Sequence, residues 1–163
     1  METRSDRIKS RSKARRCYAA AKKKIGNGTL TLHTGVFKMS LHKNSASGTI
    51  TSLSTISIFS SIIAEIAAAG GYVAGGRSVP TIAWTLGVSN LQYKFSYAAG
   101  GVIFTASGAS LASIRYALIR KSSGSTTSGF PLCYCSLSSA AFSISSPNML
   151  TILPAATGVF TMA

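Results

Sequence analysis

Short runs in which apolar and polar residues alternate recur along this chain, and segments rich in glycine, serine and threonine separate them. In Leu91–Tyr97 every second residue is apolar, which is the pattern of a strand that buries one face. Val36–His42 alternates in the same way, and its polar members Lys38, Ser40 and His42 are expected on a solvent-exposed face. Such runs, bounded by turn-forming residues, predict an all-β protein.

The stretch Gly100–Lys121 holds the two segments around which the rest of the sheet is expected to form. We predict that Val102–Thr105 and Ile114–Lys121 are strands joined by a turn and that they make the central pair of a sandwich. Arg115 lies inside the second, more apolar segment. A guanidinium there needs polar partners. The expected partners are Glu65, backbone carbonyl groups or another subunit, and we assign Arg115 and Glu65 structural roles.

One segment has helical rather than strand spacing. From Thr55 to Ala69 the large apolar residues recur every three or four positions, and Gly70 and Gly71 follow as a stop signal. Residues 44–54, just before it, are expected to form a loop. Trp84, the only tryptophan, lies in an expected strand and is also assigned a structural role. About nine or ten strands and one helix predict an antiparallel β-sandwich or jelly roll with one short α-helix.

The first 24 residues differ from the rest because they are strongly basic. Their basic side chains are Arg4, Arg7, Lys9, Arg11, Lys13, Arg15, Arg16, Lys22, Lys23 and Lys24. No apolar periodicity defines a helix that packs on a core, and like-charge repulsion should keep the segment extended or loosely helical. We therefore divide the chain into a basic N-terminal arm, residues 1–24, and a β-sandwich domain, residues 25–163. The arm is a candidate site for nucleic-acid phosphates or for an acidic groove of a neighbouring protein; a solvated tail is the third alternative.

Charge is distributed unevenly over the whole chain. The 17 lysines and arginines stand against 3 acidic residues, which gives a formal net charge of +14. From Ser122 to Ala163 no side chain is charged, whereas a free-standing domain usually keeps a mixed-charge surface. This favours a domain whose C-terminal part is covered by other protein, and a surface kept soluble by hydroxyl groups is the alternative. No run of about 20 apolar residues occurs, so we expect no membrane partner.

No catalytic, cofactor-binding or metal-binding constellation is recognisable, and we expect that the protein is not an enzyme. Neither His33 nor His42 has a plausible acidic partner, which a Ser-His-Asp triad requires. Glu65 alone cannot supply the paired carboxylates of a glycosidase. The pair Cys133 and Cys135 is a weak metal signal without a nearby histidine. We expect the three cysteines to be buried free thiols in a reducing compartment.

Several motifs, taken in their order along the chain, carry a family resemblance. They are GYVAGGR at 71–77, then Trp84, then FTASGASLASIRYALI at 104–119 and LTILPAATGVF at 150–160. Across about residues 25–162 the chain resembles small structural proteins of tailed-bacteriophage virions. The resemblance implies a virion protein: a capsid cement or decoration protein, with tail or neck components as alternatives in the same class. It implies no activity and transfers no site residues.

Three functions are therefore hypotheses. The leading one is a structural protein that reinforces a symmetric shell by binding the major capsid protein or other virion proteins; it would be located in the virion, which is assembled in the host cytoplasm. A homo-oligomer, with a trimer favoured, would satisfy exposed strand edges. The second is a nucleic-acid-binding protein that uses the arm, and the third is a receptor- or glycan-binding tail module.

Overall fold

The computed structural model of the chain describes residues 7–10, 16–86, 92–124 and 128–162. Strands dominate these residues, which confirms the predicted all-β class. The strands are β1 (Arg7–Ser10), β2 (Arg16–Cys17), β3 (Phe37–Lys43), β4 (Arg77–Ser78), β5 (Ala83–Leu86), β6 (Tyr93–Ser96), β7 (Val102–Thr105), β8 (Leu111–Ser122), β9 (Gly129–Ser136), β10 (Phe142–Ile144), β11 (Met149–Ile152) and β12 (Phe160–Met162). The helical segments are α1 (Ala19–Gly26), α2 (Ser47–Ile50) and two 3-10 turns, η1 (Asn44–Ala46) and η2 (Phe59–Ser61).

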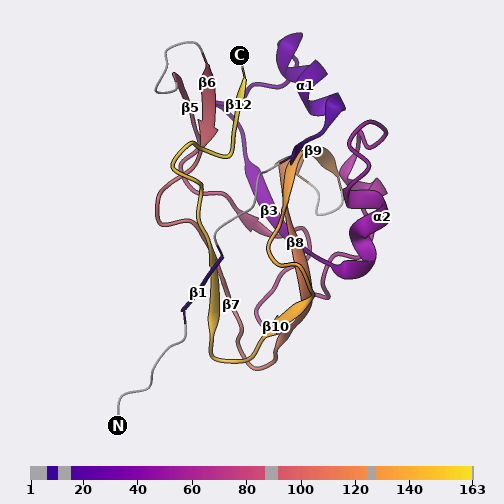
Figure 1. The fold of residues 1–163 in the computed structure, drawn as a ribbon, viewed down its shortest axis with the longest axis vertical. Helices are drawn as coiled ribbons and strands as arrows, with labels where there is room; N and C mark the ends of the chain where they lie inside the picture. The colour runs from indigo at the N-terminus through magenta and orange to yellow at the C-terminus, as the bar shows by residue number, and fades with distance from the viewer. Residues whose placement is uncertain (1–6, 11–15, 87–91, 125–127, 163) are drawn as a thin grey trace.

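Within the described ranges the strands form three sheets. The central sheet has the order β2-β9-β8-β3-β4, with β10 attached to β8; the second has the order β1-β11-β7 and the third β12-β6-β5. β1 runs parallel to β11, and the other described pairs are antiparallel. In Figure 1 the two smaller sheets lie to one side of β3, β8 and β9, and α2 lies to the other side. The arrangement is a layered β-sandwich, as the sequence predicts.

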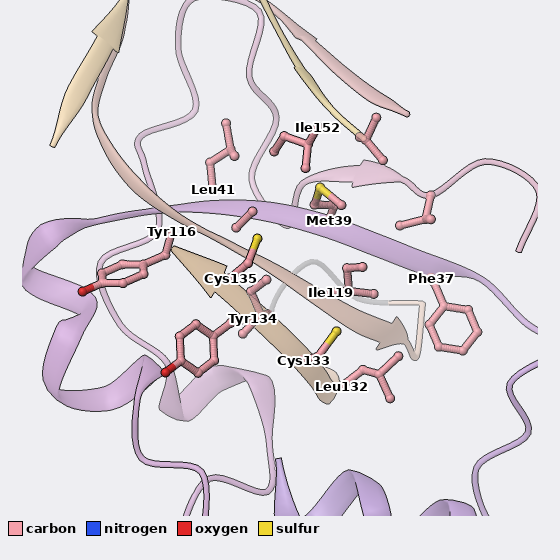
Figure 2. Close-up of a cluster of buried hydrophobic side chains, with 14 of the residues drawn as sticks. Phe37, Met39, Leu41, Tyr116, Ile119, Leu132, Cys133, Tyr134, Cys135 and Ile152 are labelled. Atoms are coloured by element: carbon pink, nitrogen blue, oxygen red, sulfur yellow. The ribbon is translucent and has the colours of Figure 1, made fainter. Parts of the chain in front are cut away.

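One face of the central sheet packs against the two smaller sheets. Phe37 and Met39 of β3 are buried on this face, and the Phe37 ring lies 5.5 Å from the ring of Phe95 in β6. Figure 2 shows Met39 and Leu41 on the same side as Ile152 of β11, while Tyr134 points to the opposite side. The predicted alternation along β3 therefore identifies correctly the apolar side chains that pack between the two layers.

The opposite face of β3 is buried as well, which corrects the expectation of a solvent-exposed face. Ser40 and His42 are both fully buried. The chain that follows β3 folds back over this face, so that the rings of Phe59 and His42 lie 6.1 Å apart, edge to face. On the same side Tyr18 donates a 2.7 Å hydrogen bond to the carbonyl of Ile50 in α2. Alternation of apolar and polar residues shows that a strand has two different faces. It does not show whether the rest of the protein covers one face or both.

The predicted central hairpin does not form, although both of its strands do. β7 pairs with β11, with Phe104 opposite Leu150, whereas β8 pairs with β3, β9 and β10. The hydrogen bond from Ala106 N–H to the Asn148 carbonyl continues the β7–β11 ladder past the end of β7. The segment between the strands thus carries the chain from one sheet into another instead of turning it back.

The predicted helix at 55–69 is also wrong, because only the 3-10 turn η2 forms within it. Ile62 has extended backbone and Ala64 has a φ of 59°, neither of which continues a helix. The α-helices lie elsewhere: α2 within the expected loop at 44–54, and α1 at the end of the basic segment. The backbone of 55–69 instead follows the surface of the central sheet as an irregular layer.

The basic segment is joined to the body of the protein along its second half. Tyr18 is fully buried and Ala21 of α1 is 1% exposed, so the expectation that no helix of this segment packs on the core is wrong. β2 pairs with β9, with Arg16 opposite Tyr134, and the Tyr18 and Tyr134 rings lie 6.0 Å apart. Tyr18 and Ala21 are enough to anchor this short helix to the core. Two buried residues are too few to give a periodic signal in the sequence.

Candidate functional site

A buried arginine lies at the centre of the molecule's main polar cluster. Arg120 of β8 is fully buried. Its Nη2 donates a 3.2 Å hydrogen bond to the Gly75 carbonyl, and its Nη1 donates to the Ser128 carbonyl. The guanidinium carbon lies 4.3 Å from the centre of the Phe59 ring. Backbone carbonyls and an aromatic face thus replace water around the charge.

Glu65 completes this cluster from the neighbouring chain segment. One of its carboxylate oxygens accepts hydrogen bonds from the Tyr72 hydroxyl, at 2.5 Å, and from the Gly75 N–H, at 2.7 Å. The Tyr72 oxygen in turn accepts the Leu41 N–H at 3.1 Å. Glu65 reaches this position because it forms a β-bridge with His42 at the open edge of β3. The carboxylate therefore holds the 63–75 segment together, and the Tyr72 oxygen joins that segment to β3.

The pKa shifts within this polar cluster arise mainly from burial, as expected for groups with a structural role. Burial lowers the pKa of Arg120, and the nearby Glu65 carboxylate opposes that shift. Burial, reinforced by the Glu65 charge, raises the pKa of the Tyr72 hydroxyl, which therefore remains a hydrogen-bond donor. Burial lowers the pKa of His42 to about 4, so its ring is neutral near pH 7. Each of these shifts arises first from burial, and the polar groups satisfy one another inside the protein.

The described contacts of Arg115 do not include Glu65, one of the partners that the sequence suggests. Arg115 is half-buried, and its Nη1 donates a hydrogen bond to the Asn44 side-chain oxygen. Its guanidinium also lies 5.3 Å from the centre of the Tyr116 ring. The partner is thus a side-chain amide rather than the expected carboxylate or backbone carbonyl. A register shift in the β3–β8 ladder, between His42 and Lys43, places Arg115 at an irregular position of the ladder.

Trp84, the third structural candidate, lies in the third sheet and belongs to an aromatic row. Trp84, Phe95 and Phe160 are directly opposite one another on β5, β6 and β12. Phe95 is fully buried against the central sheet, whereas Trp84 and Phe160 are half-buried. The Phe95 and Phe160 rings stack with centres 5.3 Å apart. This row closes one end of the core.

A second apolar row continues the same sheet face beyond the core. Leu86, Tyr93 and Met162 stand two residues from the aromatic row on their strands and therefore point to the same side. Leu86 is 53% exposed and Tyr93 is 48% exposed. The Tyr93 ring stacks on Trp84 at 5.5 Å. We call these two rows together the apolar sheet face; it carries no charged side chain, since Lys94 of β6 lies on the opposite face.

The predicted interaction arm is described only in part. Arg4, Arg11, Lys13 and Arg15 lie outside the described residues, and Arg7 and Lys9 occupy positions of β1. Among the others, Arg16, Lys22 and Lys23 are exposed. Lys24 is half-buried, and its Nζ lies 4.1 Å from the centre of the Phe130 ring. The described end of the arm thus presents cations at the surface while its backbone is part of the fold.

Sequence reasoning missed two members of this cluster: Tyr72, which donates a hydrogen bond to Glu65, and Arg120, whose charge lies near it. Arg120 follows the apolar run Tyr116–Ile119 and precedes Lys121, so its position at the end of that run gave no sign that it is the more buried of the two arginines. Comparisons with models of known protein families, with curated proteins and with solved structures found no match. No helix in the described part of the chain is long and apolar enough to cross a membrane.

Proposed function

We propose that this protein is a structural protein of a tailed-bacteriophage virion, most simply a capsid cement or decoration protein. It would stabilise a shell through contacts with the major capsid protein or another virion protein. The single observation that carries the proposal is the apolar sheet face: its outer row exposes Leu86 and Tyr93, and the described residues of its two rows include no charged side chain. The resemblance of the sequence motifs to those of such virion proteins suggests the class of partner.

The chemistry of the apolar sheet face supports a protein as its partner. The fully buried centre of a protein–protein interface is rich in aromatic residues and poor in charged ones. Tyrosine and tryptophan are also the residues that most often dominate binding energy there. The uncharged segment from Ser122 onward contributes β12, one of the two edge strands of this sheet. An apolar face beside an open strand edge favours a neighbour that covers both.

The proposal includes a closed homo-oligomer, with a trimer favoured, placed around a symmetry axis of the shell. Closed rings satisfy exposed edges and repeat each shell contact several times. The net charge of +14 would then oppose self-association through the basic segment and leave that segment to face acidic protein. Electrostatic complementarity of this kind raises the rate and specificity of docking.

Mass spectrometry of washed virions tests the proposed function, which requires that a phage encodes this chain. The protein should remain at a constant ratio to the major capsid protein through density-gradient purification and through nuclease treatment. It should also sediment with emptied shells. A chain that is made during infection but is lost from washed particles would contradict the proposal. Retention on full particles alone, with loss on nuclease treatment, would favour nucleic acid as the partner.

A nucleic-acid-binding role is the second candidate, and the exposed cations Arg16, Lys22 and Lys23 favour it. Each phosphate neutralised would contribute about −0.9 to the slope of log affinity against log salt for duplex DNA. A Lys22→Ser, Lys23→Ser double variant should therefore bind DNA more weakly and lower that slope by about 2. Binding by the unaltered protein that hardly changes with salt would exclude this role.

A further inference from the structure

Two of the three cysteines lie directly opposite each other across a pair of antiparallel strands. Cys17 of β2 pairs with Cys133 of β9. The Tyr18 N–H donates a 3.1 Å hydrogen bond to the Leu132 carbonyl, so Tyr18 and Leu132 form a hydrogen-bonded pair of this ladder. Because the two kinds of pair alternate, Cys17 and Cys133 form a non-hydrogen-bonded pair. Sequence alone did not suggest this juxtaposition, since 115 residues separate the two cysteines.

The non-hydrogen-bonded position is the one whose spacing suits a disulfide. Cα atoms of such pairs are about 4.5 Å apart and their side chains approach closely. Disulfides join Cα atoms about 4.4–6.8 Å apart. Both thiols therefore fall within bonding range without movement of the strands. No other pair of cysteines in the described residues stands opposite in a ladder.

The third cysteine, Cys135, is a poorer partner for Cys133. The two lie two positions apart on β9. Figure 2 shows both cysteines on one side of this strand, while Tyr134 points to the opposite side. Residues i and i+2 of a strand are about 6.6 Å apart with parallel side chains. A disulfide needs Cβ atoms about 3.5–4.5 Å apart. A bond between Cys133 and Cys135 would thus require distortion of β9.

The two opposing thiols differ in access and in acidity. Cys17 is half-buried, while Cys133 is fully buried. A hydrogen bond with Cys133 lowers the pKa of the Cys17 thiol, burial opposes this, and the positive charge of Lys22 adds to the lowering. Thiolate character and partial exposure are the two properties that make a cysteine react with external disulfides. Cys17 has the properties of the attacking thiol, and Cys133 those of the resolving thiol behind it.

We propose that Cys17 and Cys133 form a redox-active dithiol that closes to a cross-strand disulfide. The oxidant is a small-molecule disulfide. The Cys17 thiolate attacks one of its sulfurs, forms a mixed disulfide and releases one small thiolate. Cys133 then loses its proton and attacks Cys17 Sγ, which forms the protein disulfide and releases the second small thiolate. The two protein thiols lose two protons and two electrons, and the oxidant is reduced to two thiols.

The bond would fasten the basic N-terminal segment to the central sheet. β2 has only two residues paired with β9, so a covalent link there holds a strand that few hydrogen bonds retain. This inference stands on the β2–β9 geometry alone and does not rest on the proposed function.

Oxidation of the full-length reduced protein with oxidised glutathione, followed by non-reducing peptide mapping, tests the proposal. The monomer should lose two free thiols, and the peptides containing Cys17 and Cys133 should be joined. A Cys135→Ser variant, the matched control, should form the same link at an unchanged rate. A Cys17→Ser variant should form no intramolecular disulfide and should lose most of its reactivity with glutathione disulfide.

A Cys133→Ala variant separates the two steps of the reaction. Without the resolving thiol, Cys17 should accumulate as the mixed disulfide with glutathione, and this species should be at least tenfold rarer in the unaltered protein. Circular dichroism of the reduced forms checks that each variant keeps its β-sheet content. A link between Cys133 and Cys135, a stable mixed disulfide at Cys17 in the unaltered protein, or failure of Cys17 to react while the protein is folded would each overturn the proposal.

Discussion

The guanidinium carbon of Arg120 lies 4.3 Å from the centre of the Phe59 ring, and this contact joins the central sheet to the irregular layer that covers it. Arg120 comes from β8 and Phe59 from η2. The negative face of an aromatic ring attracts a cation, and the attraction is strongest where water is excluded. Both residues are buried, so the contact contributes to holding the covering layer in place.

Replacing Arg120 should destabilise the protein severely. Arg120→Met keeps much of the side-chain volume but leaves the Gly75 and Ser128 carbonyls without their donor. It also leaves the Glu65 carboxylate without the nearby positive charge. Removing one partner of a buried charge cluster costs roughly 3–5 kcal/mol. Urea unfolding followed by tryptophan fluorescence measures the change in the free energy of unfolding.

Arg115→Met is the matched control for that experiment, because it makes the same change five residues earlier on β8. Arg115 is half-buried and bonds to a side chain, Asn44. Loss of one such hydrogen bond costs about 1 kcal/mol. Equal losses in the two variants would contradict the distinction drawn between a core arginine and a peripheral one.

The Tyr72 hydroxyl should contribute measurably because it serves two partners at once. It donates to Glu65 and accepts from the buried Leu41 N–H. Tyr72→Phe removes both bonds without removing the ring, which stacks 5.9 Å from Phe104. Leaving a buried N–H unsatisfied costs about 1–3 kcal/mol. Tyr93→Phe, at an exposed ring, should change the free energy of unfolding by less than about 0.5 kcal/mol.

The free energy of unfolding should decrease as the pH is lowered through the range in which His42 titrates. Burial lowers the pKa of His42 from 6.5 to about 4 in the folded state. Above pH 6.5 neither state binds the proton, and the full stability is present. Between pH 6.5 and about 4 the unfolded state binds it and the folded state does not, so the free energy of unfolding falls by about 3 kcal/mol in total. Below about pH 4 this contribution falls no further.

Unfolding curves at several pH values measure that slope. A His42→Gln variant should lose the His42 part of the slope whatever its stability at pH 7. An unchanged slope in His42→Gln would show that His42 does not titrate as its burial requires.

Gly76 should tolerate no side chain, whereas Gly28 should tolerate one at modest cost. A Cβ on Gly76 would lie 2.0 Å from the Met39 carbonyl oxygen, and its φ is +79°. Gly28 has a similar φ of +73° but no atom near its Cβ position. Gly28→Ala should therefore cost only the backbone strain, about 1–2 kcal/mol. Gly76→Ala should prevent accumulation of folded protein, as judged by soluble yield and circular dichroism.

Local patterns predicted strands well and predicted their partners poorly. Val102–Thr105 forms β7 with the predicted bounds, because alternation is a local property of a pleated strand. Its partner is β11, 47 residues further on from the start of one to the start of the other. Neighbouring strands pair often enough to make a hairpin the natural expectation. Nothing in the residues of 102–121 tells that the chain changes sheets between them.

The segment 55–69 shows why apolar spacing and backbone conformation can disagree. Ile56, Phe59, Ile62 and Ile66 are buried, as the predicted helix required, whereas Ile63, the fifth residue of that pattern, is 57% exposed. An irregular chain that lies across a sheet with a 3-10 turn can bury residues at the same intervals. The isoleucines carry low helix propensity, and the β-bridge from Glu65 to His42 competes for the backbone hydrogen bonds. The tertiary contact decides between the two conformations.

The candidate site was harder to predict than the fold, because it depends on long-range contacts. Glu65 stood out in the sequence as the only acidic residue beyond the basic segment. The sequence suggested Arg115 as a partner of Glu65, whereas the charge that lies near Glu65 in the core is that of Arg120. The β3–β8 register shift between His42 and Lys43 and the covering layer decide that Arg120, not Arg115, is the fully buried one. Such shifts leave no mark in an alternating pattern.

The most direct test of the account is the occupancy of purified shells by variants of the apolar sheet face. A Leu86→Ser, Tyr93→Ser double variant removes the two most exposed side chains of the outer row, together with the stacking of Tyr93 on Trp84; circular dichroism and urea unfolding check that the variant folds. Val73→Ser is the matched control, since Val73 is 64% exposed and lies outside this face. Central aromatic contacts of an interface are typically worth about 2 kcal/mol or more. We predict at least a tenfold loss of shell affinity for the double variant, with unchanged folding and no loss for Val73→Ser; full occupancy by the double variant would contradict the account.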